Sequence, residues 1–181
     1  MRAPPAVPYS ELPPRARRRM AASSLLRSLL VSTVIVVGYF TLPMAHLVGS
    51  AGVVLVVGLA AMSSLVFWQL RGVARSSYPR IRAIGALATS VPLFFVFFAT
   101  TYFLMDGAAP SAFTEPLSRL DALYFVVTVF ATVGFGDIVA VSEPARAVVL
   151  VQMLGDLAIV GFVARAFVGA LQTGLSRRGG A

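Results

Sequence analysis

The segment at residues 132–137, TVGFGD, has residue types and spacing that suit the binding of a dehydrated cation. Potassium gives up its hydration shell where protein oxygens replace it, and rings of backbone carbonyls can do this. Successive carbonyls point at one axis when alternate residues adopt dihedral angles that L-residues resist. Gly134 and Gly136 occupy alternate positions and have that freedom, while the hydroxyl of Thr132 adds an oxygen at the inner end.

A second polar group lies inside an apolar stretch closer to the C-terminus. Gln152 and Asp156 are four residues apart, so they share one face of a helix. Charged groups at bilayer depth are costly and normally face a water-filled cavity. We therefore expect Gln152, Asp156 and Val163 to line a cavity below the TVGFGD segment, where the carboxylates would bind internal Mg²⁺ or polyamines. An Asp156 that forms hydrogen bonds between helices is the alternative.

The composition indicates a chain whose solvent is lipid. Of the 181 residues, 58% are hydrophobic and 12% are charged, and the mean hydropathy is +0.87. Four apolar segments reach the length of about 20 residues that crosses a bilayer, and lipid forces them to be helices. They cover approximately residues 29–47, 50–70, 83–105 and 145–171. Pro43 and Pro92 should bend the first and the third.

The connection at residues 106–144 is much longer than a turn and contains an apolar stretch at 122–131. About ten residues are too few to cross a bilayer but suit a re-entrant helix, whose C-terminal dipole would favour a cation. The fold class predicted is therefore an all-α integral membrane protein with four transmembrane helices and a re-entrant pore helix.

All 15 basic residues are arginine, and they set the expected orientation. They gather before the first segment, between the second and third, and after the fourth. By the positive-inside rule, both termini are cytoplasmic in a multi-pass plasma-membrane protein. A cleaved signal peptide is the alternative for the first segment, but its apolar run is too long and Arg27 interrupts its start. Arginines at the ends of apolar runs also argue against a nucleic-acid partner.

The stretch from Asp121 to Asp137, DALYFVVTVFATVGFGD, resembles the pore helix and selectivity filter of the potassium-channel pore family. The third and fourth apolar segments are similar to the outer and inner helices of that family. The resemblance implies that Asp137 braces the outer mouth and that five residues coordinate K⁺ ions, namely Thr132, Val133, Gly134, Phe135 and Gly136. One such segment is a quarter of a filter, so the resemblance also implies a homotetramer with cyclic symmetry.

Three residues before the filter are expected to support it, and two of them depart from the family's pattern. Many members have Tyr where this chain has Phe135, and its hydroxyl binds an aromatic donor on the pore helix. Phe125 occupies the place of that partner, so we expect an aromatic contact in place of the hydrogen bond. Tyr124 keeps a hydroxyl that could reach Asp137, and Thr128 stands where some members carry Glu.

The pattern divides the chain into four parts. They are a disordered basic tail at residues 1–24, a transmembrane hairpin and loop at 25–82, the pore domain at 83–172, and a short cytoplasmic tail at 173–181. Within the fourth apolar segment, Gly155 and Gly161 serve either as a gating hinge or as sites of close helix packing. The role of the hairpin, the gating stimulus and inactivation are not readable.

We expect a potassium-selective channel subunit that conducts passively, surrounded by lipid and with no cofactor other than K⁺ in the filter. The alternatives are a weakly selective cation channel and a non-conducting membrane subunit that retains the motif. We expect no enzyme and no small-molecule substrate, because the chain has no cysteine, a single histidine, and neither a convincing acid pair nor a phosphate-binding loop.

Overall fold

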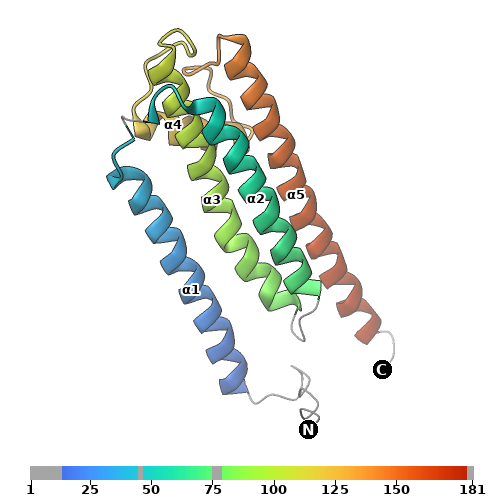
Figure 1. Cartoon of the computed structure of the whole chain (residues 1–181). Helices are drawn as coiled ribbons and strands as arrows, with labels where there is room; N and C mark the ends of the chain where they lie inside the picture. Colours follow the sequence, from blue (N-terminus) through green and yellow to red (C-terminus); the bar gives the residue numbers. More distant parts are fainter. Residues whose placement is uncertain (1–13, 45–46, 75–78, 179–181) are drawn as a thin grey trace.

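The computed structural model describes residues 14–44, 47–74 and 79–178, which form five helices (Figure 1). Four long helices run lengthwise, and the short helix α4 lies near one end. The start of α1 and the end of α5 both lie at the opposite end. The bounds are α1 Pro14–Thr41, α2 Ala51–Ala74, α3 Pro79–Ala108, α4 Arg119–Phe130 and α5 Glu143–Arg178.

Three helices within the described residues are long and apolar enough to cross a membrane. Their apolar parts are Ala51–Gln69, Ile84–Ala108 and Glu143–Arg165, whereas α1 contributes a shorter apolar part, Leu26–Thr41. The three long apolar helices correspond to the second, third and fourth predicted segments. The described part of the chain is therefore all-helical, with three helices that could cross a membrane.

Both predicted boundaries of the first segment need correction. Helix α1 ends at Thr41 rather than at residue 47, because Pro43 disfavours helical geometry in the residue before it and cannot continue the helix. Helix α1 also begins at Pro14, a residue type that suits the first turn of a helix. Residues 14–24 are consequently helical, in contrast to the predicted disordered tail, and residues 1–13 lie outside the described part.

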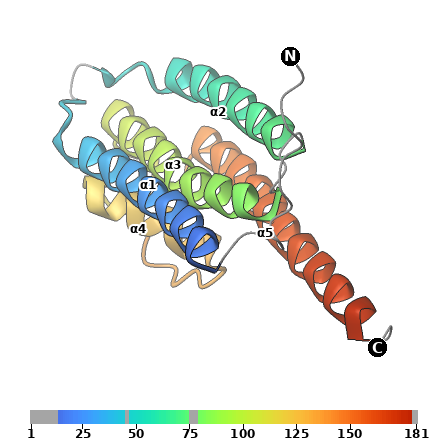
Figure 2. The same ribbon diagram turned by 90° about the horizontal axis from the view of Figure 1, so that it is seen from below.

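Helix α3 is the centre of the bundle, with α1 and α2 packed on it along their lengths and α4 packed near its end (Figure 2). The helix continues through Pro92, which has no N–H to donate to the carbonyl of Ala88. The hydroxyl of Ser32 on α1 donates to that carbonyl at 3.0 Å. One turn earlier, Ser28 donates to the carbonyl of Gly85 at 3.2 Å.

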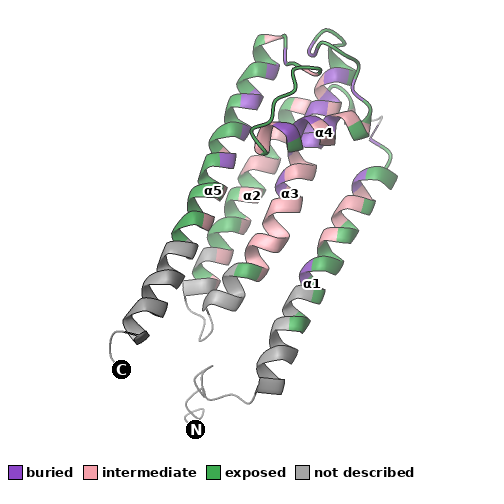
Figure 3. Ribbon diagram, turned by 180° about the vertical axis from the view of Figure 1, so that it is seen from behind, coloured by how far each residue is buried: buried purple, intermediate pink, exposed green. Residues whose placement is uncertain are grey.

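The core is concentrated where α4 meets α3 (Figure 3). Tyr102 on α3 lies 5.3 Å from the ring of Phe125 on α4 and 5.6 Å from the ring of Phe113. All three rings are buried, and they meet edge to face, a favourable arrangement for aromatic pairs. This cluster fixes α4 against α3 and so determines where the TVGFGD segment begins.

Helix α5 is held much less tightly by the rest of the chain. Its contacts with α3 and α4 are far less extensive than those of α1 with α3. Leu150, Leu154 and Leu157 share one face by their spacing and are 62%, 68% and 69% exposed. A single chain therefore leaves an apolar face of α5 uncovered.

Candidate functional site

Helix α4 is positioned at its first turn by a capping box. The hydroxyl of Ser118 accepts a hydrogen bond from the backbone N–H of Asp121 at 3.2 Å, and the Asp121 carboxylate accepts one from the N–H of Ser118 at 3.0 Å. This pair satisfies two N–H groups that a helix start leaves free. The helix ends at Phe130 with Ala131 as its C-cap, one residue before the TVGFGD segment, so the negative end of its dipole faces that segment.

The backbone of the TVGFGD segment alternates in the way that the glycine spacing predicts. Gly134 and Gly136 have φ angles of +54° and +81°, and Thr132 has a φ of +57°. Every second residue from 132 to 136 is thus in the left-handed region. Among β-branched residues this conformation is a genuine outlier, and such strain costs roughly 1–3 kcal/mol and is typical of functional sites.

Thr132 was missed as a member of this alternation, although extending the two-residue spacing back from Gly134 would have found it. The turn before it is anchored by one acceptor on α4. The carbonyl of Thr128 accepts from the N–H of Val133 at 3.1 Å and from the N–H of Gly134 at 3.4 Å. The hydroxyl of Thr128 is buried and donates to the carbonyl of Phe125 at 2.9 Å, so the side chain stabilises the end of α4.

Asp137, at the far end of the segment, is tied back to α4. The hydroxyl of Tyr124 donates to its carboxylate at 2.8 Å, and the N–H of Ile138 donates to the other carboxylate oxygen at 3.0 Å. The Tyr124 hydrogen bond holds the pKa of Asp137 below its usual value and raises the pKa of Tyr124. The expected contact between these two side chains is therefore present.

The aromatic contact of Phe135 within one chain is made with Tyr124. The two rings are parallel to within 3°, with centroids 6.4 Å apart. Phe125 instead packs between Tyr102 and Phe113. We expected Phe125 to make the aromatic contact with Phe135. Within a single chain it does not, because the side chain of Phe125 points into the core.

The cavity-lining prediction for Gln152 and Asp156 needs correction. Both side chains are buried, at 0% and 7% exposure. The amide of Gln152 donates to Asp156 at 3.3 Å and to the carbonyl of Val126 on α4 at 3.1 Å, and its oxygen accepts from the hydroxyl of Tyr102 at 2.7 Å. These contacts join α3, α4 and α5, as the interhelical alternative required.

The second carboxylate oxygen of Asp156 is buried and has no hydrogen-bond partner in the described part of the chain. The binding of Mg²⁺ or polyamines expected at Asp156 stays a prediction. Val163, the third predicted cavity residue, lies half-buried farther along α5, where none of the described contacts joins it to Gln152 or Asp156.

Residues 90–173 match the family model of an ion channel. The matched part begins in α3 and includes α4, the TVGFGD segment and most of α5. This part of the chain is therefore similar to an ion channel, and it contains most of two of the three described helices that are long and apolar enough to cross a membrane. No curated protein and no solved structure matches the chain at a significant level.

Gly155 and Gly161 of α5 have different surroundings. A Cβ atom on Gly155 would lie 2.7 Å from the ring of Phe94 on α3, whereas a Cβ atom on Gly161 would meet no described atom within 4 Å. Helix α5 continues through both positions. Of the two roles left open by the sequence, close helix packing applies to Gly155.

Arg119 is a functional candidate that the sequence argument did not single out. Its guanidinium donates to the carbonyls of Tyr39 and Leu42, each at 2.7 Å, and the hydroxyl of Tyr39 donates to the carbonyl of Arg119 at 2.7 Å. The same guanidinium lies over the ring of Phe103 on α3, 5.6 Å from its centroid. The end of α1 is thereby fixed to the first residue of α4. The available signal was that Arg119 is the one basic residue in the long connection at 106–144.

Proposed function

We propose that the chain is a subunit of a potassium-selective channel that conducts K⁺ passively through a pore made by four copies. The alternate left-handed dihedral angles at Thr132, Gly134 and Gly136 carry the proposal. This alternation lets consecutive carbonyls face one axis, which is the arrangement that replaces the hydration shell of the ion. In this proposal, five residues coordinate K⁺, with Asp137 at the outer mouth. They are Thr132, Val133, Gly134, Phe135 and Gly136.

The exposure of the segment supports assembly. Val133 and Phe135 are 53% and 70% exposed in one chain, although non-helical backbone at membrane depth needs protein around it. One chain supplies one such segment, and four copies around an axis would complete the ring. The clusters of arginine, and the common end at which α1 starts and α5 finishes (Figure 1), support a plasma-membrane protein with both termini cytoplasmic.

Flux measurements on purified protein in liposomes test this function against its alternatives. Under a potassium gradient, with a sodium gradient as the control, we expect K⁺ flux and little Na⁺ flux. Equal fluxes of the two ions would favour a weakly selective cation channel. Absence of flux under all conditions would favour a non-conducting membrane subunit that retains the motif.

A matched pair of variants tests the backbone geometry. In Gly134→Ala, the new Cβ would meet no described atom within 4 Å, and the same is true of Gly52→Ala on α2. Only Gly134 has a positive φ, at which an L-residue loses roughly 1–2 kcal/mol. We expect Gly134→Ala to reduce K⁺ flux about tenfold or more, because each of the four copies would carry this strain. Gly52→Ala should retain normal flux, and similar flux in both variants would contradict the proposal.

A further inference from the structure

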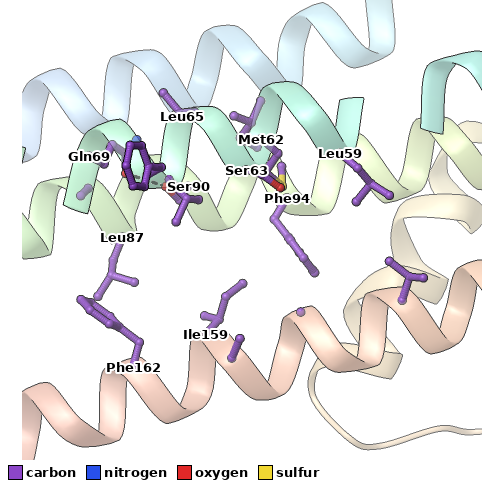
Figure 4. A pocket seen from close by; sticks show the side chains of 17 residues that line it. Leu59, Met62, Ser63, Leu65, Gln69, Leu87, Ser90, Phe94, Ile159 and Phe162 are labelled. Atoms are coloured by element: carbon purple, nitrogen blue, oxygen red, sulfur yellow. Dashed lines mark hydrogen bonds between the residues drawn. The ribbon is translucent and has the colours of Figure 1, made fainter. Parts of the chain in front are cut away.

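Helices α2, α3 and α5 surround an apolar cavity of about 630 Å³, here called the side cavity (Figure 4). Leu59 and Met62 line it from α2, Leu87 and Phe94 from α3, and Ile159 and Phe162 from α5. Protein interiors are otherwise close-packed, and a volume of this size is typical of a ligand site. A folded membrane protein would fill such a space with something apolar.

The side cavity is accessible from outside the chain and lies in its membrane-crossing part. Phe67 and Phe162, which line it, are 59% and 37% exposed. Its walls belong to the apolar parts Ala51–Gln69, Ile84–Ala108 and Glu143–Arg165. The molecules next to it in a bilayer are therefore lipid acyl chains.

Three of the described polar side chains line the side cavity, namely Ser63, Gln69 and Ser90. The last two lie toward the end of α2 that carries Arg71. The hydroxyl of Ser90 donates to the side-chain oxygen of Gln69 at 2.9 Å, so these two atoms satisfy each other, and the remaining walls are mostly apolar. Phe94 and Gly155 both line the cavity, and the ring of Phe94 occupies the space next to Gly155, where a side chain would otherwise be.

A cationic group stands next to the cavity at the same end. Arg71 is exposed in the last turn of α2, and its guanidinium lies 5.1 Å from the ring centroid of Phe67, a cavity residue. Helix α2 contains no acidic residue, and no carboxylate pairs with Arg71 among the described residues. Guanidinium groups bind phosphate with two parallel hydrogen bonds.

We propose that the side cavity binds one acyl chain of an anionic phospholipid whose phosphate pairs with Arg71. The apolar walls take the acyl chain, and the charge at the end of α2 selects the headgroup. A bound acyl chain would separate α5 from α2 and α3 along the cavity. The proposal depends on membrane insertion and not on potassium conduction, so the two can fail separately.

Photolabelling tests the site with the full chain in phosphatidylcholine nanodiscs that contain a minor fraction of phosphatidylglycerol with a diazirine in its acyl chain. Mass spectrometry should find the label concentrated on the cavity-lining parts of α2, α3 and α5. Ser63 lines the cavity, whereas the neighbouring Ser64 is absent from its walls and donates to the carbonyl of Ala60 in its own helix. We expect Ser63→Trp to reduce labelling about fivefold or more by filling the space, and Ser64→Trp to leave it unchanged.

A second variant guards against misfolding of the first, and a charge variant tests the headgroup. Ala158→Trp enters the same cavity from α5 and should reduce labelling to a similar extent. Arg71→Gln should remove the preference for phosphatidylglycerol over phosphatidylcholine as a competitor, a preference of about fivefold for one arginine. Arg27→Gln, at an exposed position of α1, should keep that preference.

Four results would overturn the proposal. Labelling spread evenly over all helices, or labelling unchanged by both tryptophan variants, would mean that no acyl chain enters the cavity. An unaltered competitor preference in Arg71→Gln would reject the headgroup contact. If a benzophenone side chain introduced at Ser63 produced covalent oligomers instead of lipid adducts, a second copy of the chain would be the occupant.

Discussion

Both ends of the candidate filter are held by hydrogen bonds with α4. Thr128 accepts from the N–H groups of Val133 and Gly134 at the inner end, and Tyr124 donates to Asp137 at the outer end. Positive φ angles between these anchors store strain that the surroundings must hold. The sequence could predict the glycine positions and the Tyr124 contact, because both follow from chemistry and spacing. The strained φ of Thr132 was missed because its residue type argues against it, although the two-residue spacing of the glycines extends back to it.

At the residue scale, Tyr124→Phe should make the proposed channel more sensitive to acid. The hydrogen bond from Tyr124 lowers the pKa of Asp137 from its usual 3.8. The stabilisation that this hydrogen bond gives is therefore fully present above pH 3.8, and it is lost as the pH falls through the lowered pKa. Without the Tyr124 hydroxyl, the pKa of Asp137 rises toward its usual value. We therefore expect acid inactivation of K⁺ flux to begin at a higher pH.

Liposome flux measured against external pH checks this prediction. Ser64→Ala is the control, because its hydroxyl bonds only within its own helix at an exposed site. Coincident pH profiles for Tyr124→Phe and the unmodified chain would contradict it.

At the scale of helices, two prolines free two carbonyls, and a neighbouring element uses each of them. Pro92 leaves the carbonyl of Ala88 without its helical donor, and Ser32 supplies one. Pro43 likewise cannot donate to the carbonyl of Tyr39, and Arg119 supplies the hydrogen bond. Apolar length and proline positions predicted the helices, but these partners lie far apart in the chain and only folding brings them together.

Arg119→Met should destabilise the protein by about 2 kcal/mol, because a charged donor is lost and a carbonyl that Pro43 has already freed is left without a partner. Tyr39→Phe should cost about 1 kcal/mol, since its hydroxyl donates to a carbonyl inside α4. Thermal unfolding in detergent would measure both. Arg27→Met, at an exposed site on α1, is the control, and equal midpoints for Arg119→Met and Arg27→Met would show that the contact adds nothing.

Alanine substitutions should separate packing from flexibility in α5. Alanine is favoured over glycine inside a helix by about 1 kcal/mol, so Gly161→Ala, which meets no described atom, should stabilise the protein. In Gly155→Ala the Cβ would displace the buried ring of Phe94, at a cost of about 1–3 kcal/mol. Opposite shifts of the unfolding midpoint are expected. Stabilisation by both substitutions would mean that close packing is not the role of Gly155.

At the scale of the whole molecule, the parts that the sequence predicted least well are those that depend on which helix faces which. Gln152 and Asp156 were correctly placed on one helix face by their spacing, but that face turns toward α3 and α4. Periodicity shows that two residues share a face and does not identify its neighbour. The leucines on one face of α5 remain exposed in the described part of one chain. In the proposed tetramer, this apolar face is where further copies would pack.

Leu154→Trp should weaken the proposed tetramer. Leu154 is 68% exposed on α5, and an indole ring there would force neighbouring copies apart at a cost of about 1–3 kcal/mol per copy. Val57→Trp places the same ring at a 61% exposed site on α2, where no assembly contact is proposed. Light scattering in detergent should find four copies for the unmodified chain and for Val57→Trp, and smaller species for Leu154→Trp. An intact tetramer in Leu154→Trp would exclude this face of α5 from the subunit contact, because association inside a membrane depends on close helix packing.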